Sequence, residues 1–482
     1  MRSDLPLAGV AGRRRLPPFL RGLVALALLG SLHACHDSDT TGPEPSDLLD
    51  RLNALPGVTA AETAPQAGYQ RAFRIDVTQP VDHERPQGAT FTQRAYLSHV
   101  DEDAPMVFGP SGYGASERSS SELAGILQGN GLYVVHRHFP DARPEPFDWQ
   151  YLNVRQAAAD HHRIVHLFRR IYGGPWVSTG GSKGGMTAVF HRRFYPDDVD
   201  ATVAYVAPFS LALGDERYVT HLASVGTAEE RAAIHAFQRR LLEHRDSLLW
   251  RYERWFVRND LDFSLPLGPA FEARVQSYQW GFWQNRRFDY RDIPGRGASY
   301  DAWLEHLVVA AWASLDSDQL RAYYNPYYYQ ALTELGHPAM DTDHLADLLV
   351  EEPITVQERF SLPEVLPPYS PSTIQDVLQW LATKGDRIIY IYGGMDPWTG
   401  GAVELTGGAD ALKIVQPEAD HRVRIKDLDQ RDLVLATLGR WLGFDVTQVP
   451  ARGLVFPAPR ISPDLVVHMI PSPIPETLPS RP

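Results

Sequence analysis

The pentapeptide Gly180-Gly181-Ser182-Lys183-Gly184 constrains the fold more than any other part of the sequence. It follows a short apolar run at 176–179 and precedes a stretch with helical spacing at 183–194. Its glycines allow a turn too tight for a side chain on either flank, and such a turn lifts the serine hydroxyl above the end of a strand. A strand, a sharp turn and a helix in this order predict a parallel sheet with a reactive serine at its carboxyl edge.

Strand and helix signals alternate on both sides of this turn. Short apolar runs lie at 73–77, 90–97, 106–108, 133–135, 202–207, 387–392 and 412–415, and helical spacing occurs at 154–171 and 428–442. From about Leu213 to Leu366 the pattern changes to long helical stretches. We therefore predict an α/β protein with an α/β-hydrolase fold and an inserted helical cap domain.

Six consecutive parts of the chain are predicted. They are a signal peptide at 1–34, a tether at 35–68, the first part of the α/β-hydrolase core at 69–212, a helical cap insertion at 213–368, the second part of the core at 369–446 and a proline-rich C-terminal tail at 447–482. The tether and the tail are predicted from composition, because neither offers much apolar periodicity.

The N-terminal segment has the order of a secretion signal. Arginines precede an apolar run from Leu23 to Leu32, which is too short to span a membrane. Cys35 follows the small residue Ala34, and this arrangement resembles a bacterial lipoprotein signal, whose cysteine carries a lipid. We expect an exported protein that is anchored to a membrane of the bacterial cell envelope through Cys35. A soluble secreted protein is the alternative.

The net charge, the cysteine content and the absence of certain motifs limit which partners, crosslinks and cofactors we expect. The net charge is −13, which disfavours nucleic acid as a partner. Cys35 is the only cysteine, so no disulfide can form within one chain. The sequence has no H-E-x-x-H, paired-cysteine or G-x-x-x-x-G-K-[ST] pattern, and we therefore expect neither a metal nor a cofactor.

Ser182 needs two partners to act as a nucleophile, because a serine hydroxyl is unreactive at neutral pH. A histidine must take its proton, and an acid must orient that histidine. Asp396 follows the strand predicted at 387–392, where hydrolase folds carry their acid. His421 lies after the next strand and before the closing helix. We predict Ser182, Asp396 and His421 as the catalytic triad of a serine hydrolase; the alternative is a structural glycine-rich turn.

The oxyanion formed during attack on a carbonyl group needs two backbone donors. The first is the N–H after the nucleophile, which belongs to Lys183. We expect the second from Gly112 or Tyr113, in the glycine-rich loop that follows the strand at 106–108.

An aromatic cluster in the helical insertion is a candidate substrate pocket. Trp280, Phe282 and Trp283 could line an apolar cavity, although aromatic side chains on a helix more often belong to a core.

Four motifs together resemble one family. The chain carries them in the order Gln79–His83, Thr90–Arg94, Trp149–Leu152 and Gly181–Gly185. In this it is similar to secreted bacterial prolyl tri/tetrapeptidyl aminopeptidases and, more distantly, to lysosomal prolyl carboxypeptidase. The resemblance implies a serine peptidase that cleaves after proline and releases short peptides from a free N-terminus through an acyl-enzyme. It also implies that Ser182, Asp396 and His421 hold the matching positions.

Two other functions stay open on the residues alone. The same triad under a helical lid serves esterases and lipases. A surface-binding lipoprotein could keep the fold with an inactive triad. The partners that we expect are a proline-containing peptide and, through Cys35, a membrane.

Overall fold

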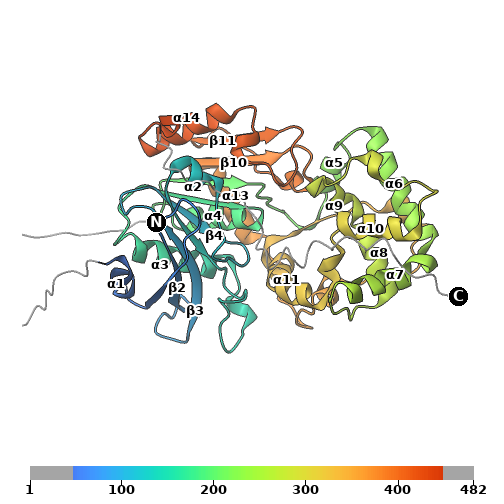
Figure 1. The fold of residues 1–482 in the computed structure, drawn as a ribbon, viewed down its shortest axis with the longest axis horizontal. Helices are drawn as coiled ribbons and strands as arrows, with labels where there is room; N and C mark the ends of the chain where they lie inside the picture. The colour runs from blue at the N-terminus through green and yellow to red at the C-terminus, as the bar shows by residue number, and fades with distance from the viewer. Residues whose placement is uncertain (1–46, 449–482) are drawn as a thin grey trace, which may run out of the picture. The chain divides into compact units, whose positions relative to one another are not determined.

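The computed structural model describes residues 47–448, which contain a central nine-stranded sheet (Figure 1). The strand order is β1-β2-β3-β5-β4-β6-β7-β10-β11. The strands are β1 (Val58–Thr63), β2 (Arg71–Pro80), β3 (Thr90–His99), β4 (Met106–Pro110), β5 (Asn130–Val134), β6 (Trp176–Gly181), β7 (Ala201–Tyr205), β10 (Ile388–Gly393) and β11 (Ala411–Gln416). The six strands from β5 to β11 in this order run parallel, whereas β1, β2 and β3 extend the sheet in antiparallel pairs.

Helices cover both faces of the sheet. Successive residues of a strand point to opposite sides, and in the buried strands the side chains on both sides are shielded from water by helices. On β4, Met106 and Phe108 pack in one core cluster with α3 (Val154–Phe168), whereas Val107 packs with α2 (Glu122–Leu127). The face of α3 also carries α4 (Lys183–Phe194) and α13 (Ser372–Lys384), and the face of α2 carries α14 (Arg431–Leu442).

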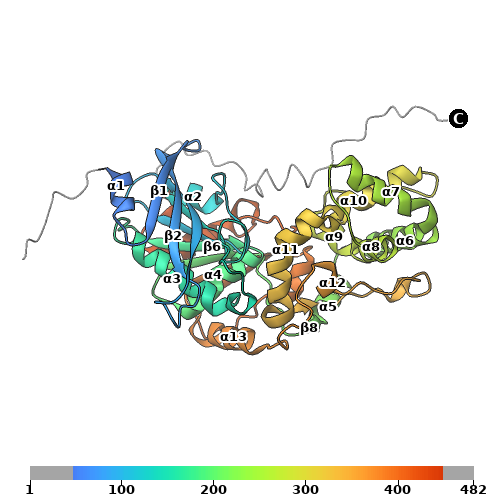
Figure 2. The same ribbon diagram turned by 90° about the horizontal axis from the view of Figure 1, so that it is seen from below.

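A helical insertion lies between β7 and α13 in the sequence. It contains α5 (Arg217–Leu222), α6 (Ala228–Glu243), α7 (Arg245–Arg258), α8 (Leu267–Gln276), α9 (Tyr278–Asn285), α10 (Tyr300–Ala310), α11 (Asp318–Gln330) and α12 (Val356–Arg359). Helices α5 to α10 build a core of their own around side chains such as Phe237 and Phe271, whereas α11 packs against side chains of the sheet domain such as Leu152. In both views α11 lies nearer to the sheet than α6, α7 and α8 do (Figures 1 and 2). A parallel pair, β8 (Leu213–Asp215) with β9 (His337–Pro338), joins two distant points of the insertion.

The folded core begins earlier than predicted, and the expected tether is wrong for residues 47–68. Leu48 and Leu52 of α1 (Leu48–Asn53), together with Leu55, are buried in the same cluster as α3. β1 then pairs with β2 along its whole length. The sequence hides this start because α1 has only six residues and directly follows a long polar run.

Several predicted features lie outside the described residues. These are the signal peptide, Cys35, the tether up to residue 46 and the tail from residue 449. Within residues 47–448, no helix is both long enough and apolar enough to cross a membrane.

Candidate active site

Ser182 occupies the turn between β6 and α4. Its backbone has φ 56° and ψ −129°, a conformation that residues with a side chain rarely adopt. The Ser182 N–H donates to the Tyr205 carbonyl at 2.9 Å, which ties the turn to β7. A Cβ on Gly180 would lie 2.4 Å from backbone atoms of Gly184, so only glycine fits there. The turn has the strained strand-to-helix geometry that presents a serine at the edge of a sheet.

Asp396 and His421 meet beyond the carboxyl ends of β10 and β11. The Asp396 side chain is fully buried, and its Oδ2 lies 2.6 Å from His421 Nδ1. Its Oδ1 accepts a hydrogen bond from the Trp398 N–H at 3.1 Å, so both carboxylate oxygens are engaged. The backbone N–H of His421 donates to the carbonyl of Gln284 in α9 at 3.1 Å. These contacts hold the imidazole through Nδ1, and within residues 47–448 nothing is bonded to Nε2.

The sheet order brings Ser182 and the Asp396–His421 pair to one edge. β6, β7 and β10 are adjacent and parallel, so their carboxyl ends point the same way. Only β7 separates the strand before Ser182 from the strand before Asp396, and two strand spacings amount to about 10 Å.

The glycine-rich loop after β4 packs directly on the serine turn. A Cβ on Gly112 would lie 2.6 Å from the carbonyl carbon of Lys183, so the two backbones are in contact. The loop is also held by α11, because the Gly114 N–H donates to the Tyr323 hydroxyl at 3.0 Å. Gly112 is therefore placed against the N-terminus of α4.

The structure distinguishes the two candidates for the second oxyanion donor. The Tyr113 N–H is already bonded to Ser111 Oγ at 3.0 Å. In the described part of the chain, no acceptor meets the N–H of Gly112 or that of Lys183. The loop thus offers Gly112, and not Tyr113, as the free donor beside Lys183.

Sequence comparison decides the family. The sequence model of the family described as PS-10 peptidase S37 matches residues 41–454, which is most of the chain. The chain belongs to the peptidase S37 family. The prolyl tri/tetrapeptidyl aminopeptidase of Streptomyces mobaraensis is 35% identical over 442 residues, which cover 89% of this chain and 92% of that protein. This S37 peptidase is a serine peptidase, so the predicted family and enzyme class are confirmed.

Solved structures similar to this S37 peptidase are distant in sequence. The proline iminopeptidase of Mycobacterium smegmatis is 14% identical, with a TM-score of 0.36 over 76% of this chain and 98% of that one. The α/β hydrolase GrgF from Penicillium is also 14% identical, with a TM-score of 0.34 over 77% of this chain and 99% of its own.

The three aromatic residues predicted to line a pocket of the S37 peptidase differ in how far they are buried. Phe282 and Trp283 are 4% and 1% exposed and belong to the core of the helical insertion, so their prediction as pocket residues is wrong. Trp280 packs against the outside of the same core and is only partly buried. Trp280 is half-buried, and its ring lies 4.9 Å from that of Trp398, which in turn lies 6.4 Å from His421.

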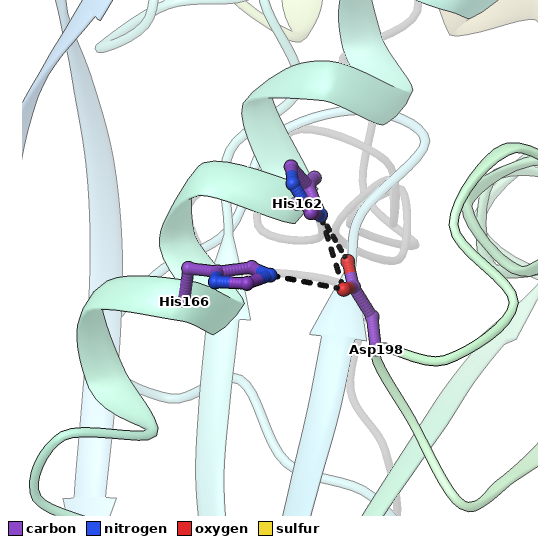
Figure 3. A group of neighbouring side chains, drawn as sticks. All are labelled: His162, His166 and Asp198. Atoms are coloured by element: carbon purple, nitrogen blue, oxygen red, sulfur yellow. Dashed lines mark hydrogen bonds and ion pairs between the residues drawn. The ribbon is translucent and has the colours of Figure 1, made fainter. Parts of the chain in front are cut away.

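In the described part of this S37 peptidase, one cluster of three side chains has ligand atoms close enough to share a metal ion (Figure 3). His162 and His166 of α3 and Asp198 have these atoms within 4.8 Å of one another. Burial alone would raise the pKa of Asp198, but hydrogen bonds from His162 and the buried His191 lower it to about 2. Asp198 follows the C-terminal end of α4, whereas Ser182 precedes its N-terminal end. Twelve helical residues span about 18 Å, so an ion held there takes no part at Ser182.

Proposed function

We propose that Ser182, Asp396 and His421 form the triad of a peptidase that cleaves after proline and releases short peptides from a free N-terminus. The observation that carries this proposal is the strained Ser182 turn at the same sheet edge as a buried Asp396 that holds His421 at 2.6 Å. The substrate class is supported by the 35% identical relative, a prolyl tri/tetrapeptidyl aminopeptidase.

In the proposed reaction, Ser182 Oγ attacks the carbonyl carbon of the prolyl residue, and its proton passes to His421 Nε2. Asp396 keeps Nδ1 protonated and stabilises the imidazolium that forms. When the tetrahedral intermediate collapses, the carbon–nitrogen bond breaks and His421 returns the proton to the leaving amine. Water then hydrolyses the acyl-enzyme by the same steps, which releases the short peptide and restores Ser182.

The oxyanion of this intermediate accepts from the N–H groups of Lys183 and Gly112, which are free and adjacent. Each such donor contributes roughly 3 kcal/mol to transition-state stabilisation. The N-terminus of α4 adds a favourable field for negative charge.

An apolar surface beside His421 supports recognition of a proline ring. Trp280 and Trp398 pack edge to face, with interplanar angle 80°, and both side chains are half-buried at the junction of α9 with the loop after β10. Aromatic faces of this kind bind an apolar ring at little cost in conformational entropy.

Chromogenic peptides test the proposal. The mature enzyme should hydrolyse a tripeptide p-nitroanilide ending in proline much faster than its N-acetylated form, because only the former has a free amino group. Ser182→Ala should lose at least about a thousandfold in kcat and should no longer react with a fluorophosphonate. Faster turnover of a short acyl ester than of the peptide would favour an esterase instead. Activity in Ser182→Ala would refute the nucleophile.

We also propose that the enzyme is exported and anchored through Cys35. The support is the N-terminal sequence alone, in which basic residues, an apolar run and Ala34-Cys35 follow in the order of a lipoprotein signal.

A further inference from the structure

The side chain of Lys183, the residue that follows Ser182, is buried. The residue is 3% exposed, and in the part of the chain that the structure describes no carboxylate forms an ion pair with its Nζ. Nζ lies 5.7 Å from the ring centroid of Tyr113 and 5.5 Å from that of Phe139. Burying an ammonium group without a carboxylate is costly, and aromatic faces offset only part of that cost. A methionine would fill the same space without this cost.

The one hydrogen bond that Lys183 Nζ makes among the described residues is to the loop that packs on the serine turn. Nζ donates to the Gly112 carbonyl at 2.7 Å. We propose that Lys183 is a positioning residue: its side chain fixes Gly112, whose N–H forms the oxyanion hole together with the N–H of Lys183 itself. This inference rests on the proposed function and adds to it a residue that acts through the loop.

Gly112 needs such a contact because glycine has more backbone freedom than any other residue. The loop is anchored on both sides of Gly112, where the Ser111 N–H donates to the Val134 carbonyl at 3.1 Å and the Gly114 N–H to Tyr323. Between these anchors, the peptide group that joins Gly112 to Tyr113 is held at both ends: its N–H donates to Ser111 Oγ at 3.0 Å, and its carbonyl accepts from Nζ. Without the bond from Nζ, the carbonyl end is released, and the neighbouring Gly112 N–H is aimed less well at the developing oxyanion.

The hydrogen bond does not require a charge on Lys183. Burial lowers the pKa of this amine to about 7, and the attraction of Glu334 only partly opposes the shift. A neutral amine still has two N–H bonds, so it can donate to the Gly112 carbonyl in either protonation state.

The test compares Lys183→Met and Lys183→Gln with Thr187→Val as a matched control. Thr187 lies one turn further along α4, is 4% exposed and bonds only to the Lys183 carbonyl, so its variant removes a buried hydrogen bond without touching the loop. We expect Lys183→Met to lose 10- to 100-fold in kcat on the prolyl p-nitroanilide, with KM within about threefold, because the donor matters most in the transition state. The fluorophosphonate labelling rate should fall by the same factor.

Lys183→Gln keeps a donor on a shorter side chain, so its kcat should lie between those of Lys183→Met and the wild type. It also provides the test if the methionine variant does not fold. Thr187→Val should stay within about twofold of the wild type. The inference is overturned if kcat of Lys183→Met is unchanged or if only its KM rises. It is also overturned if kcat of Lys183→Gln is no higher than that of Lys183→Met. If the methionine variant does not fold, a wild-type kcat of Lys183→Gln overturns it. These outcomes leave the proposed function intact, because that proposal fails only if Ser182→Ala stays active or the prolyl peptides are not cleaved.

Discussion

Asp396 is the residue whose replacement should change the chemistry without changing the shape of the site. Asparagine fills the same volume, but its amide would donate to His421 Nδ1 and force the ring proton onto Nε2. Nε2 could then no longer accept the proton of Ser182. We expect Asp396→Asn to lose roughly 10⁴ in kcat on a prolyl p-nitroanilide while its melting temperature stays close to that of the wild type.

Asp420→Asn is the matched control for this prediction. Asp420 precedes His421, but its carboxylate bonds to Arg422 instead of the imidazole. Its kcat should therefore remain within a few-fold of the wild type. Equal losses in the two variants would show that charge near His421 matters, and not the bond to Nδ1.

The buried amine of Lys183 also makes the stability of the folded protein depend on pH. Its pKa is about 7 in the folded protein, below the ordinary value of 10.5, so between these values the unfolded chain binds the extra proton. Wild-type stability therefore gains up to about 1.4 kcal/mol per pH unit from this group as pH rises from 7 toward 10. Lys183→Met lacks this gain, and we expect it to be the more stable protein at pH 7.

Urea unfolding of both proteins at pH 7, 8 and 9 measures this difference. The advantage of the methionine variant should shrink as pH rises. The titratable groups around Nζ are Glu334, whose charge attracts it, and His136 and His161, whose pKa values burial holds below their ordinary range. The two histidines are neutral throughout this pH range, so they cannot cause the trend. A constant difference at all three pH values would contradict it.

The motif residues behind the family resemblance could be located in the sequence, but their structural role could not be predicted from it. Gln79 and Gln93 lie on neighbouring strands, and Gln79 Nε2 donates to Gln93 Oε1 at 2.9 Å in the buried interior. His83 Nε2 lies 2.7 Å from Asp160, which is also paired with the buried Arg137. These motifs encode a buried polar network that joins β2, β3 and α3. Its partners are far apart in the sequence, so the pattern alone gave no role to them.

At the scale of elements, α1 provides a direct test of where the fold begins. Leu52 is fully buried in the cluster with α3, whereas Leu49 on the same helix is only partly buried. We expect Leu52→Ala to reduce the free energy of unfolding by about 2–5 kcal/mol and Leu49→Ala by clearly less. Chemical denaturation measures both. If both variants had wild-type stability, residues 47–55 would act as a tether after all.

The elements that sequence predicted well are those with strong local signals. The apolar run at 176–179 became β6, and the helix predicted at 183–194 became α4 with the same bounds. The burial of Phe282 and Trp283 and the choice between Gly112 and Tyr113 could not be read in this way. They depend on which face of a helix meets another helix, or on which N–H in a loop is already bonded, and those contacts join distant parts of the chain.

At the scale of the whole molecule, the N-terminal segment predicts attachment to a membrane. We expect Cys35→Ser to move the enzyme from the membrane fraction to the soluble fraction, because serine offers no thiol for a lipid. Turnover of the prolyl substrate should be unchanged, since Cys35 precedes the folded core. Ser38→Ala is a control in the same segment and should stay with the membrane. Wild-type protein that is soluble and carries no lipid would refute the anchor.

The placement of the helical insertion has a consequence for how the enzyme comes into being. Ser182 precedes the insertion, whereas Asp396 and His421 follow it. A growing chain therefore carries the proposed nucleophile long before the proposed acid and base exist. The strand that positions Asp396 can join the sheet only after the whole insertion has been made. Until the C-terminal part folds, the serine has no base to activate it. With the proposed triad, the order of the chain thus delays proteolytic activity until the C-terminal part of the core has been made.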